Sequence, residues 1–175
     1  TAIPLLACPL AVIGFLDDRH NLPAMWRYGV QLLTAFLMLG VSHLVQKVVL
    51  EVASGSWFLL LFLALLTISV TAVINFTNFM DGLDGLVAGC MAIAIAALSS
   101  VLNQPWSLLA LVGSLLGFLL WNWSPAKVFM GDGGSTFLGS VFAGLVLQAH
   151  SWAEAFACLL VATPLLADAC LCVLR

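Results

Sequence analysis

Aspartates gather in three short polar segments of an otherwise apolar chain. Asp17 and Asp18 are adjacent in "FLDDRH", Asp81 and Asp84 share "NFMDGLDG", and Asp132 lies in "MGDGGS". Neighbouring carboxylates repel each other unless a cation or a proton intervenes, so such groups indicate a metal site, a site for a basic ligand group or a tuned base. Mg²⁺ prefers oxygen ligands and commonly uses one or two carboxylates with substrate phosphates. Together the segments predict a site where a divalent cation holds phosphate groups.

The middle segment, "NFTNFMDGLDGL", spaces its polar residues regularly. Asn75, Asn78, Asp81 and Asp84 follow one another at intervals of three. If the segment is helical, these side chains share one face, and a polar stripe that faced lipid would be costly. We therefore expect the stripe to face a polar cavity. An EF-hand fits poorly, because leucine and glycine would occupy positions that need oxygen ligands.

The third segment places Asp132 among glycines, directly before Ser135, where we expect a helix to begin. The free N–H groups at a helix start favour anions such as phosphate. The segment is not a P-loop, because no lysine precedes Ser135. Arg19, Arg27 and Lys127 are available to neutralise phosphate oxygens. Phosphoryl transfer fits these groups, since positioning and charge stabilisation carry most of its rate. Taken singly, each segment also fits an ordinary polar connector.

Composition identifies the elements that position these segments. Of the 175 residues, 63% are hydrophobic and only 7% are charged. The apolar fraction is far above that of a usual soluble domain, and the charged fraction is far below it. We predict an all-α, polytopic transmembrane helical bundle of about seven spans. The predicted spans are Thr1 to Leu16, Tyr28 to Gln46, Trp57 to Asn75, Leu83 to Leu102, Ser107 to Trp123, Ser135 to His150 and Ala155 to Leu174. We expect residues 1–175 to form a single integral-membrane catalytic domain that is truncated at both ends.

Basic residues indicate which side of the membrane the aspartates face. Arg19, Arg27, Lys127 and Arg175 fall on the side of the aspartate segments, and only Lys47 falls on the other. Lysine and arginine near span ends stay in the cytoplasm. The predicted site therefore faces the cytoplasm.

The three motifs occur in a characteristic order: "DD" after a span, then "NxxNxxDGxDGL", then "VFMGDxGS". In this the chain resembles the polyprenyl-phosphate N-acetylhexosamine-1-phosphate transferases over essentially its whole length. The resemblance implies a Mg²⁺-dependent enzyme, with Mn²⁺ as an alternative ion, in the bacterial cytoplasmic (inner) membrane. Its partners would be a UDP-N-acetylhexosamine, undecaprenyl phosphate, the lipid bilayer and a second copy in a homodimer, with no nucleic acid. It would transfer a sugar-1-phosphate to the lipid phosphate and release UMP.

The resemblance also implies roles for individual residues. Asp17 and Asp18 would lie where the lipid phosphate attacks, as base or as phosphate organisers, and Asp132 would be the principal metal ligand. The residues around Gly82 would recognise the uracil, and the ring of Phe129 would stack on it. The full expectation is catalytic Asp17, Asp18, Asp81 and Asp84, the metal ligand Asp132, and substrate contacts from Arg27, Asn78, Gly82, Leu83, Asn122 and Phe129.

Two features depart from the family pattern. His20, His43 and His150 do not supply the histidine-rich loop that helps to hold the donor, and the first polar loop is short and lacks the lysine-rich stretch of the peptidoglycan-type members. With "NFMDG", the short loop favours the branch that initiates O-antigen and enterobacterial common antigen. The alternative is the peptidoglycan-precursor phospho-MurNAc-pentapeptide translocase. A membrane transporter, suggested only by the Thr163-Pro164 step before Asp168, and a non-catalytic relative remain as further alternatives.

Overall fold

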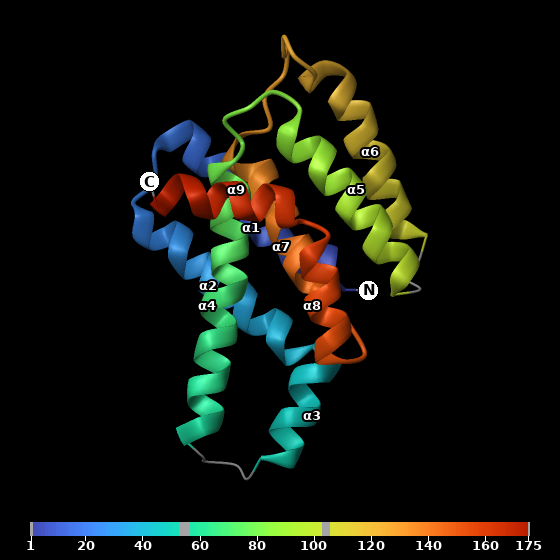
Figure 1. Cartoon of the computed structure of the whole chain (residues 1–175). Coiled ribbons are helices and arrows are strands. Elements are labelled where there is room, and N and C mark those ends of the chain that lie inside the picture. The colour runs from blue at the N-terminus through green and yellow to red at the C-terminus, as the bar shows by residue number, and fades with distance from the viewer. Residues whose placement is uncertain (1, 53–56, 103–105, 175) are drawn as a thin grey trace.

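The computed structural model describes residues 2–52, 57–102 and 106–174 and contains nine helices and no strand within them. The helices are α1 (Ile3–His20), α2 (Ala24–Gly40), α3 (His43–Glu51), α4 (Trp57–Phe79), α5 (Leu86–Val101), α6 (Ser107–Asn122), α7 (Gly131–Val146), α8 (Trp152–Leu160) and α9 (Thr163–Leu174). Every predicted apolar run corresponds to a helix or to a pair of helices (Figure 1). The expected all-α membrane helical bundle is confirmed.

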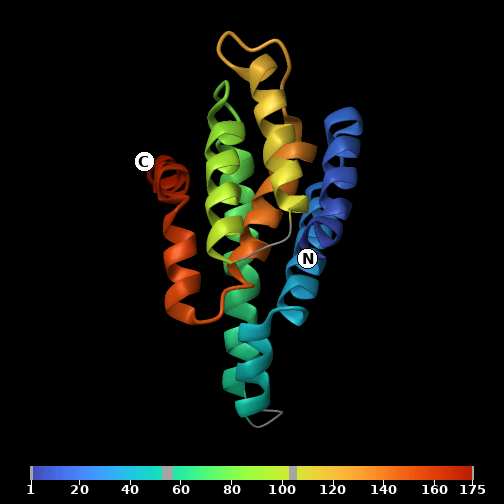
Figure 2. The ribbon, with the colours of Figure 1, turned by 90° about the vertical axis from the view of Figure 1, so that its right-hand side faces the viewer.

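Helix α7 forms the centre of the bundle. It packs most extensively against α1 and α4 and also contacts α2, α5 and α8, while α5 and α6 pair side by side along one flank (Figures 1 and 2). Its small residues allow this. A Cβ on Gly139 would lie 3.0 Å from the backbone of Ile74, and a Cβ on Gly144 would lie 2.6 Å from the side chain of Ile3. Small residues let helix backbones approach closely in a membrane, where packing drives association.

The crossing of α1 and α7 is the closest of these contacts. A Cβ on Gly14 would lie only 2.5 Å from the Cα of Gly133, so the two backbones touch at this point. Asp17 and Asp18 follow one turn later on α1, and Asp132 directly precedes Gly133. The crossing therefore brings the first and third aspartate segments together.

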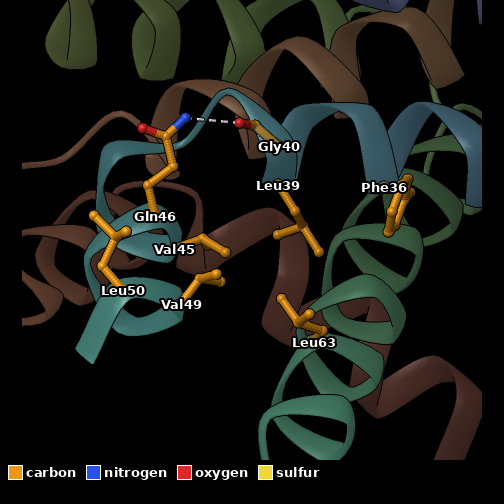
Figure 3. A pocket seen from close by; sticks show the side chains of 8 residues that line it. All are labelled: Phe36, Leu39, Gly40, Val45, Gln46, Val49, Leu50 and Leu63. Atoms are coloured by element: carbon orange, nitrogen blue, oxygen red, sulfur yellow. Dashed lines mark hydrogen bonds between the residues drawn. The ribbon is translucent and has the colours of Figure 1, made fainter. Parts of the chain in front are cut away.

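Two of the predicted spans are each divided into two helices that meet at a bend. The predicted run from Tyr28 to Gln46 divides into α2 and α3, which meet at 72°. Ser42 causes the break, because its Oγ accepts a hydrogen bond from the N–H of Val45 at 3.4 Å and so begins a new helix. Figure 3 shows the corner, where the amide of Gln46 donates to the carbonyl oxygen of Gly40 at 2.8 Å beside an apolar cavity of about 390 Å³.

The last predicted run, from Ala155 to Leu174, also divides. Helices α8 and α9 meet at 75°, and Pro164 occupies the first turn of α9, where its missing N–H has no helical partner to lose. Helix α9 then lies across α4 near the aspartate end of the bundle (Figure 1).

The bends change how membrane spans are counted. By length and composition, α4 alone among the described helices is long and apolar enough to cross a membrane, and up to three spans result if each bent pair counts as one. Helices α5 and α6 are apolar but shorter.

Candidate active site

The three polar segments meet at one end of the bundle, around the carboxylate of Asp132. Nη1 of Arg27, from α2, lies 3.1 Å from Oδ2 of Asp132. Nδ2 of Asn78, from the last turn of α4, donates to Oδ1 of Asp132 and to Oγ of Ser135, each at 2.9 Å. Helices α2 and α4 therefore hold opposite oxygens of one carboxylate at the start of α7.

Asp17 is bound to the same arginine. Its Oδ2 lies 2.6 Å from Nη1 of Arg27, and its Oδ1 accepts the N–H of Leu22 at 2.7 Å. Asn21, in the left-handed conformation with φ of 47°, ends α1 and turns that N–H back toward the helix. Asp17 is only 8% exposed, so both of its oxygens are committed within the protein. This geometry orients Arg27.

Asp18 contacts the beginning of α7 instead. Its Oδ1 accepts the backbone N–H of Asp132 at 3.2 Å, an interaction that the positive end of the α7 dipole favours. Gly131 has φ of +68°, and a Cβ there would lie 2.5 Å from Oδ2 of Asp18. A glycine is therefore required for the close approach of this carboxylate.

Asp81 lies in the turn after α4, which ends at Phe79. Burial raises the pKa of Asp81 to about 6, and the negative charges of Asp132 and Asp18 add to this effect, although the N–H of Gly131 opposes it. The carboxylates of Asp81, Asp132 and Asp18 thus lie close enough to influence one another.

The helical stripe predicted for the middle segment is wrong beyond Asn78. Helix α4 ends at Phe79, and Oδ2 of Asp84 accepts the backbone N–H of Ala126 at 3.0 Å. Gly85, with φ of +74°, reverses the chain before α5 begins. Asp81 and Asp84 therefore face different partners instead of sharing one wall of the site.

Asn122 ties the two connecting loops together. Its side chain accepts the N–H of Gly85 at 3.0 Å and donates to the carbonyl oxygen of Val128 at 2.9 Å. Leu83 and Phe129, on these two loops, are 62% and 75% exposed. The loops are thus held in fixed relation with apolar side chains accessible at their surface.

The two loops carry the residues that are predicted to contact the nucleotide. A Cβ on Gly82 would meet nothing within 4 Å, so its backbone is open to a ligand. The uracil contacts expected of Gly82, Leu83, Asn122 and Phe129 stay predictions.

Two basic residues do not join the site. The guanidinium of Arg19 lies 5.1 Å from the ring centroid of Phe15, and Nζ of Lys127 lies 5.6 Å from that of Trp121. These cation–π contacts at exposed positions hold both cations over aromatic rings. Within the described residues, Arg27 is the basic side chain that contacts the aspartates.

Sequence reasoning missed Gln31. Its amide pairs with that of Asn75, and both line a polar cavity of about 310 Å³ together with Arg27, Asn78 and Asp132. The available signal was its position, one helical turn after Arg27 on a helix that is otherwise mostly apolar.

The site's suitability for a divalent cation follows from its donors. No set of three or more His, Cys, Asp or Glu side chains in the described part of the chain converges as a complete metal site. Burial is the main cause of the raised pKa of Asp81, and the negative charges of Asp132 and Asp18 add to it. Each oxygen of Asp132 accepts one hydrogen bond here and keeps a second lone pair. A cation that takes one or two carboxylates and completes its shell with phosphate and water fits this arrangement.

These features define an integral-membrane helical protein with a carboxylate- and amide-lined polar site at one end of its bundle. The sequence model of glycosyl transferase family 4 matches residues 1–150. The chain belongs to that family.

Three similar proteins carry the same curated name, phospho-N-acetylmuramoyl-pentapeptide-transferase. The protein from Mycobacterium sp. (strain JLS) is 35% identical over 83% of this chain and 53% of its own length. The protein from Chlamydia trachomatis serovar L2 is 39% identical over 74% of this chain and 47% of its own length. The protein from Mycolicibacterium gilvum (strain PYR-GCK) is 33% identical over 83% of this chain and 53% of its own length. The chain therefore spans about half the length of these relatives. Their names do not support the O-antigen branch favoured above and match its alternative.

Proposed function

We propose that the protein is a phospho-sugar transferase, which moves a phosphorylated amino sugar from a UDP-linked donor to a polyprenyl phosphate in the membrane. We further propose that the sugar is N-acetylmuramoyl-pentapeptide, as in the names of the relatives. The observation that carries the proposal is the binding of Asp132, whose two carboxylate oxygens accept hydrogen bonds from Arg27 and Asn78. The carboxylates of Asp17, Asp18 and Asp81 lie in the same region. An N-acetylhexosamine donor is the alternative.

In the proposed reaction, an oxygen of the lipid phosphate attacks the sugar-bearing phosphorus. A new P–O bond forms, the bond to the UMP oxygen breaks, and UMP leaves with the electron pair. The attacking phosphate has a second pKa of about 6 and is already largely ionised near neutrality, so the step requires no protein base. Asp17 and Asp18 are therefore assigned to organising the site. The engagement of Asp17 by Arg27 and Leu22 supports that role.

Other residues of the chain would bind the phosphates, the metal ion and the uracil. Arg27, fixed by Asp17 and Asp132, presents positive charge to phosphate oxygens. Asp132 and Asp81 would hold Mg²⁺, which when bound offsets negative charge on the pyrophosphate and the departing UMP. Asn78 keeps Asp132 oriented by binding both it and Ser135. The exposed Phe129 is available to stack on the uracil.

The test uses the full-length parent protein in membranes that contain undecaprenyl phosphate. Exchange of labelled UMP into UDP-N-acetylmuramoyl-pentapeptide and into UDP-N-acetylglucosamine would be measured with and without Mg²⁺. We expect exchange with the first donor that requires lipid, metal and an intact Asp132, with Asp132→Asn reducing it at least about a hundredfold. Glu51→Gln, at the opposite end of the bundle, is the control and should leave exchange unchanged.

Each outcome has a definite meaning. Exchange with UDP-N-acetylglucosamine alone would retain the transferase and replace its sugar. No exchange with any UDP-sugar, from protein that is folded and embedded, would overturn the proposed activity.

A further inference from the structure

Two amide side chains form a reciprocal pair across α2 and α4. Nδ2 of Asn75 donates to Oε1 of Gln31 at 2.9 Å, and Nε2 of Gln31 lies 3.4 Å from Oδ1 of Asn75. Asn75 also donates to the carbonyl oxygen of Thr71 on its own helix at 2.8 Å. Gln31 is 5% exposed and Asn75 is half-buried, so the pair lies largely inside the bundle. The mutual hydrogen bonds offset much of the cost of placing these amides away from water.

The pair lies one helical turn from the groups that hold Asp132. Gln31 follows Arg27 by four residues on α2, and Asn75 precedes Asn78 by three residues on α4. Such spacings place side chains on the same helix face. All four residues line the polar cavity together with Asp132. The amide pair is therefore part of the wall of the candidate active site.

The hydrogen bonds from Arg27 and Asn78 to Asp132 depend on the separation of α2 and α4. Arg27 reaches one carboxylate oxygen from α2, and Asn78 reaches the other from α4. Among the described residues, no hydrogen bond other than those of the Gln31–Asn75 pair joins these two helices directly. A change in their separation would draw Arg27 or Asn78 away from Asp132.

We propose that Gln31 and Asn75 are positioning residues, which set the distance between α2 and α4 so that Arg27 and Asn78 hold Asp132 in its reactive orientation. For catalysis, the inference rests on the proposed phospho-sugar transfer. Neither amide is required to touch the substrate. Their effect is geometric, and a misplacement of about 1 Å at a reacting centre can cost about a hundredfold in rate.

The variants remove or exchange the amides in the full-length parent. Gln31→Met keeps the length of the side chain and deletes its amide, and Asn75→Leu does the same on α4. The double exchange, Gln31→Asn with Asn75→Gln, keeps one amide of each length between the helices. Gln46→Met is the matched control, since Gln46 also donates an amide hydrogen bond, to Gly40, at the α2–α3 corner remote from the aspartates (Figure 3).

Steady-state kinetics with the donor that the wild type uses provide the first measurement. We expect Gln31→Met and Asn75→Leu to lower kcat about ten- to a hundredfold with KM changed less than about twofold. The double exchange should recover most of the loss, and Gln46→Met should match the wild type. An unchanged kcat in Gln31→Met, or a raised KM at constant kcat, would overturn the positioning role. So would a double exchange as slow as the single variants.

Hydrogen–deuterium exchange of the embedded protein provides a measurement that needs no activity. Gln31→Met should speed exchange in residues 24–34 and 71–79, and Gln46→Met should not. If the wild type proves inactive with every donor, the proposed function fails, and this measurement alone decides the inference. Faster exchange confined to those segments would support the structural link between α2 and α4, and unchanged exchange would overturn it.

Discussion

At the scale of single residues, the protonation of Asp81 links the site to stability. The pKa of Asp81 is raised from 3.8 to about 6, so the folded state binds this proton more tightly than the unfolded state. The resulting stabilisation is complete below about pH 4 and is lost as the pH rises through about 6. Asp81→Asn removes the charge that folding must bury. We expect its free energy of unfolding to equal that of the wild type near pH 4, to exceed it increasingly up to about pH 6.5 and to stay higher by about 1 kcal/mol, after allowance for solvent screening.

Thermal unfolding in detergent with a chelator, between about pH 4 and pH 8, measures this difference. Asp168→Asn, on an exposed position of α9, is the control and should follow the wild type throughout. A difference for Asp81→Asn that is independent of pH would contradict the assignment.

Arg27 and Asp17 should be coupled energetically. Removing the guanidinium leaves the buried carboxylate of Asp17 with one backbone donor, from Leu22. Breaking such a pair is costlier than removing both partners, because an uncompensated buried charge remains. We expect Arg27→Met to lower the free energy of unfolding by about 1–3 kcal/mol and Asp17→Asn, added to it, to restore part of the loss. A double-mutant cycle on thermal unfolding measures the coupling, and additive effects would refute it.

At the scale of helices, the Gly14 contact predicts a strict requirement for glycine. A Cβ at this position has no room against the backbone of Gly133, which cannot move aside as a flexible side chain could. We expect Gly14→Ala to lower the free energy of unfolding by about 1–3 kcal/mol. Gly113→Ala on α6 is the matched control, since a Cβ there meets nothing within 4 Å, and it should be neutral or slightly stabilising. Thermal unfolding of the two variants compares them directly, and equal effects would contradict the crossing.

The helices and the meeting of the three polar segments could be predicted from the sequence, because apolar runs must alternate with polar connectors along a membrane bundle. The bends could not be predicted from hydropathy, because a run from Tyr28 to Gln46 stays apolar whichever direction the helix takes. Ser42 and Pro164 were the local signals available. The hydrogen bond of Asp84 to Ala126, 42 residues later, is a partner that spacing alone does not reveal.

At the scale of the whole molecule, the aspartate end and the α3 end should lie on opposite sides of the membrane. Leu83 and Phe129 are exposed at the first, and Glu51 ends α3 at the second (Figure 1). We expect Leu83→Cys and Phe129→Cys in the parent protein to react with a membrane-impermeant maleimide in everted vesicles, and Glu51→Cys to react in intact spheroplasts. The wild type, with its own cysteines, sets the background. The reverse pattern would invert the proposed orientation.

The contact between Gly14 and Gly133 has a mechanical consequence. Helices in a bilayer tilt and shift as lipid thickness changes, and long side chains at an interface can change rotamer to follow such movements. Two backbones in direct contact cannot adjust in this way. The register between Asp18 and Asp132 is therefore set by peptide geometry, and we expect it to change little when the thickness of the surrounding lipid changes.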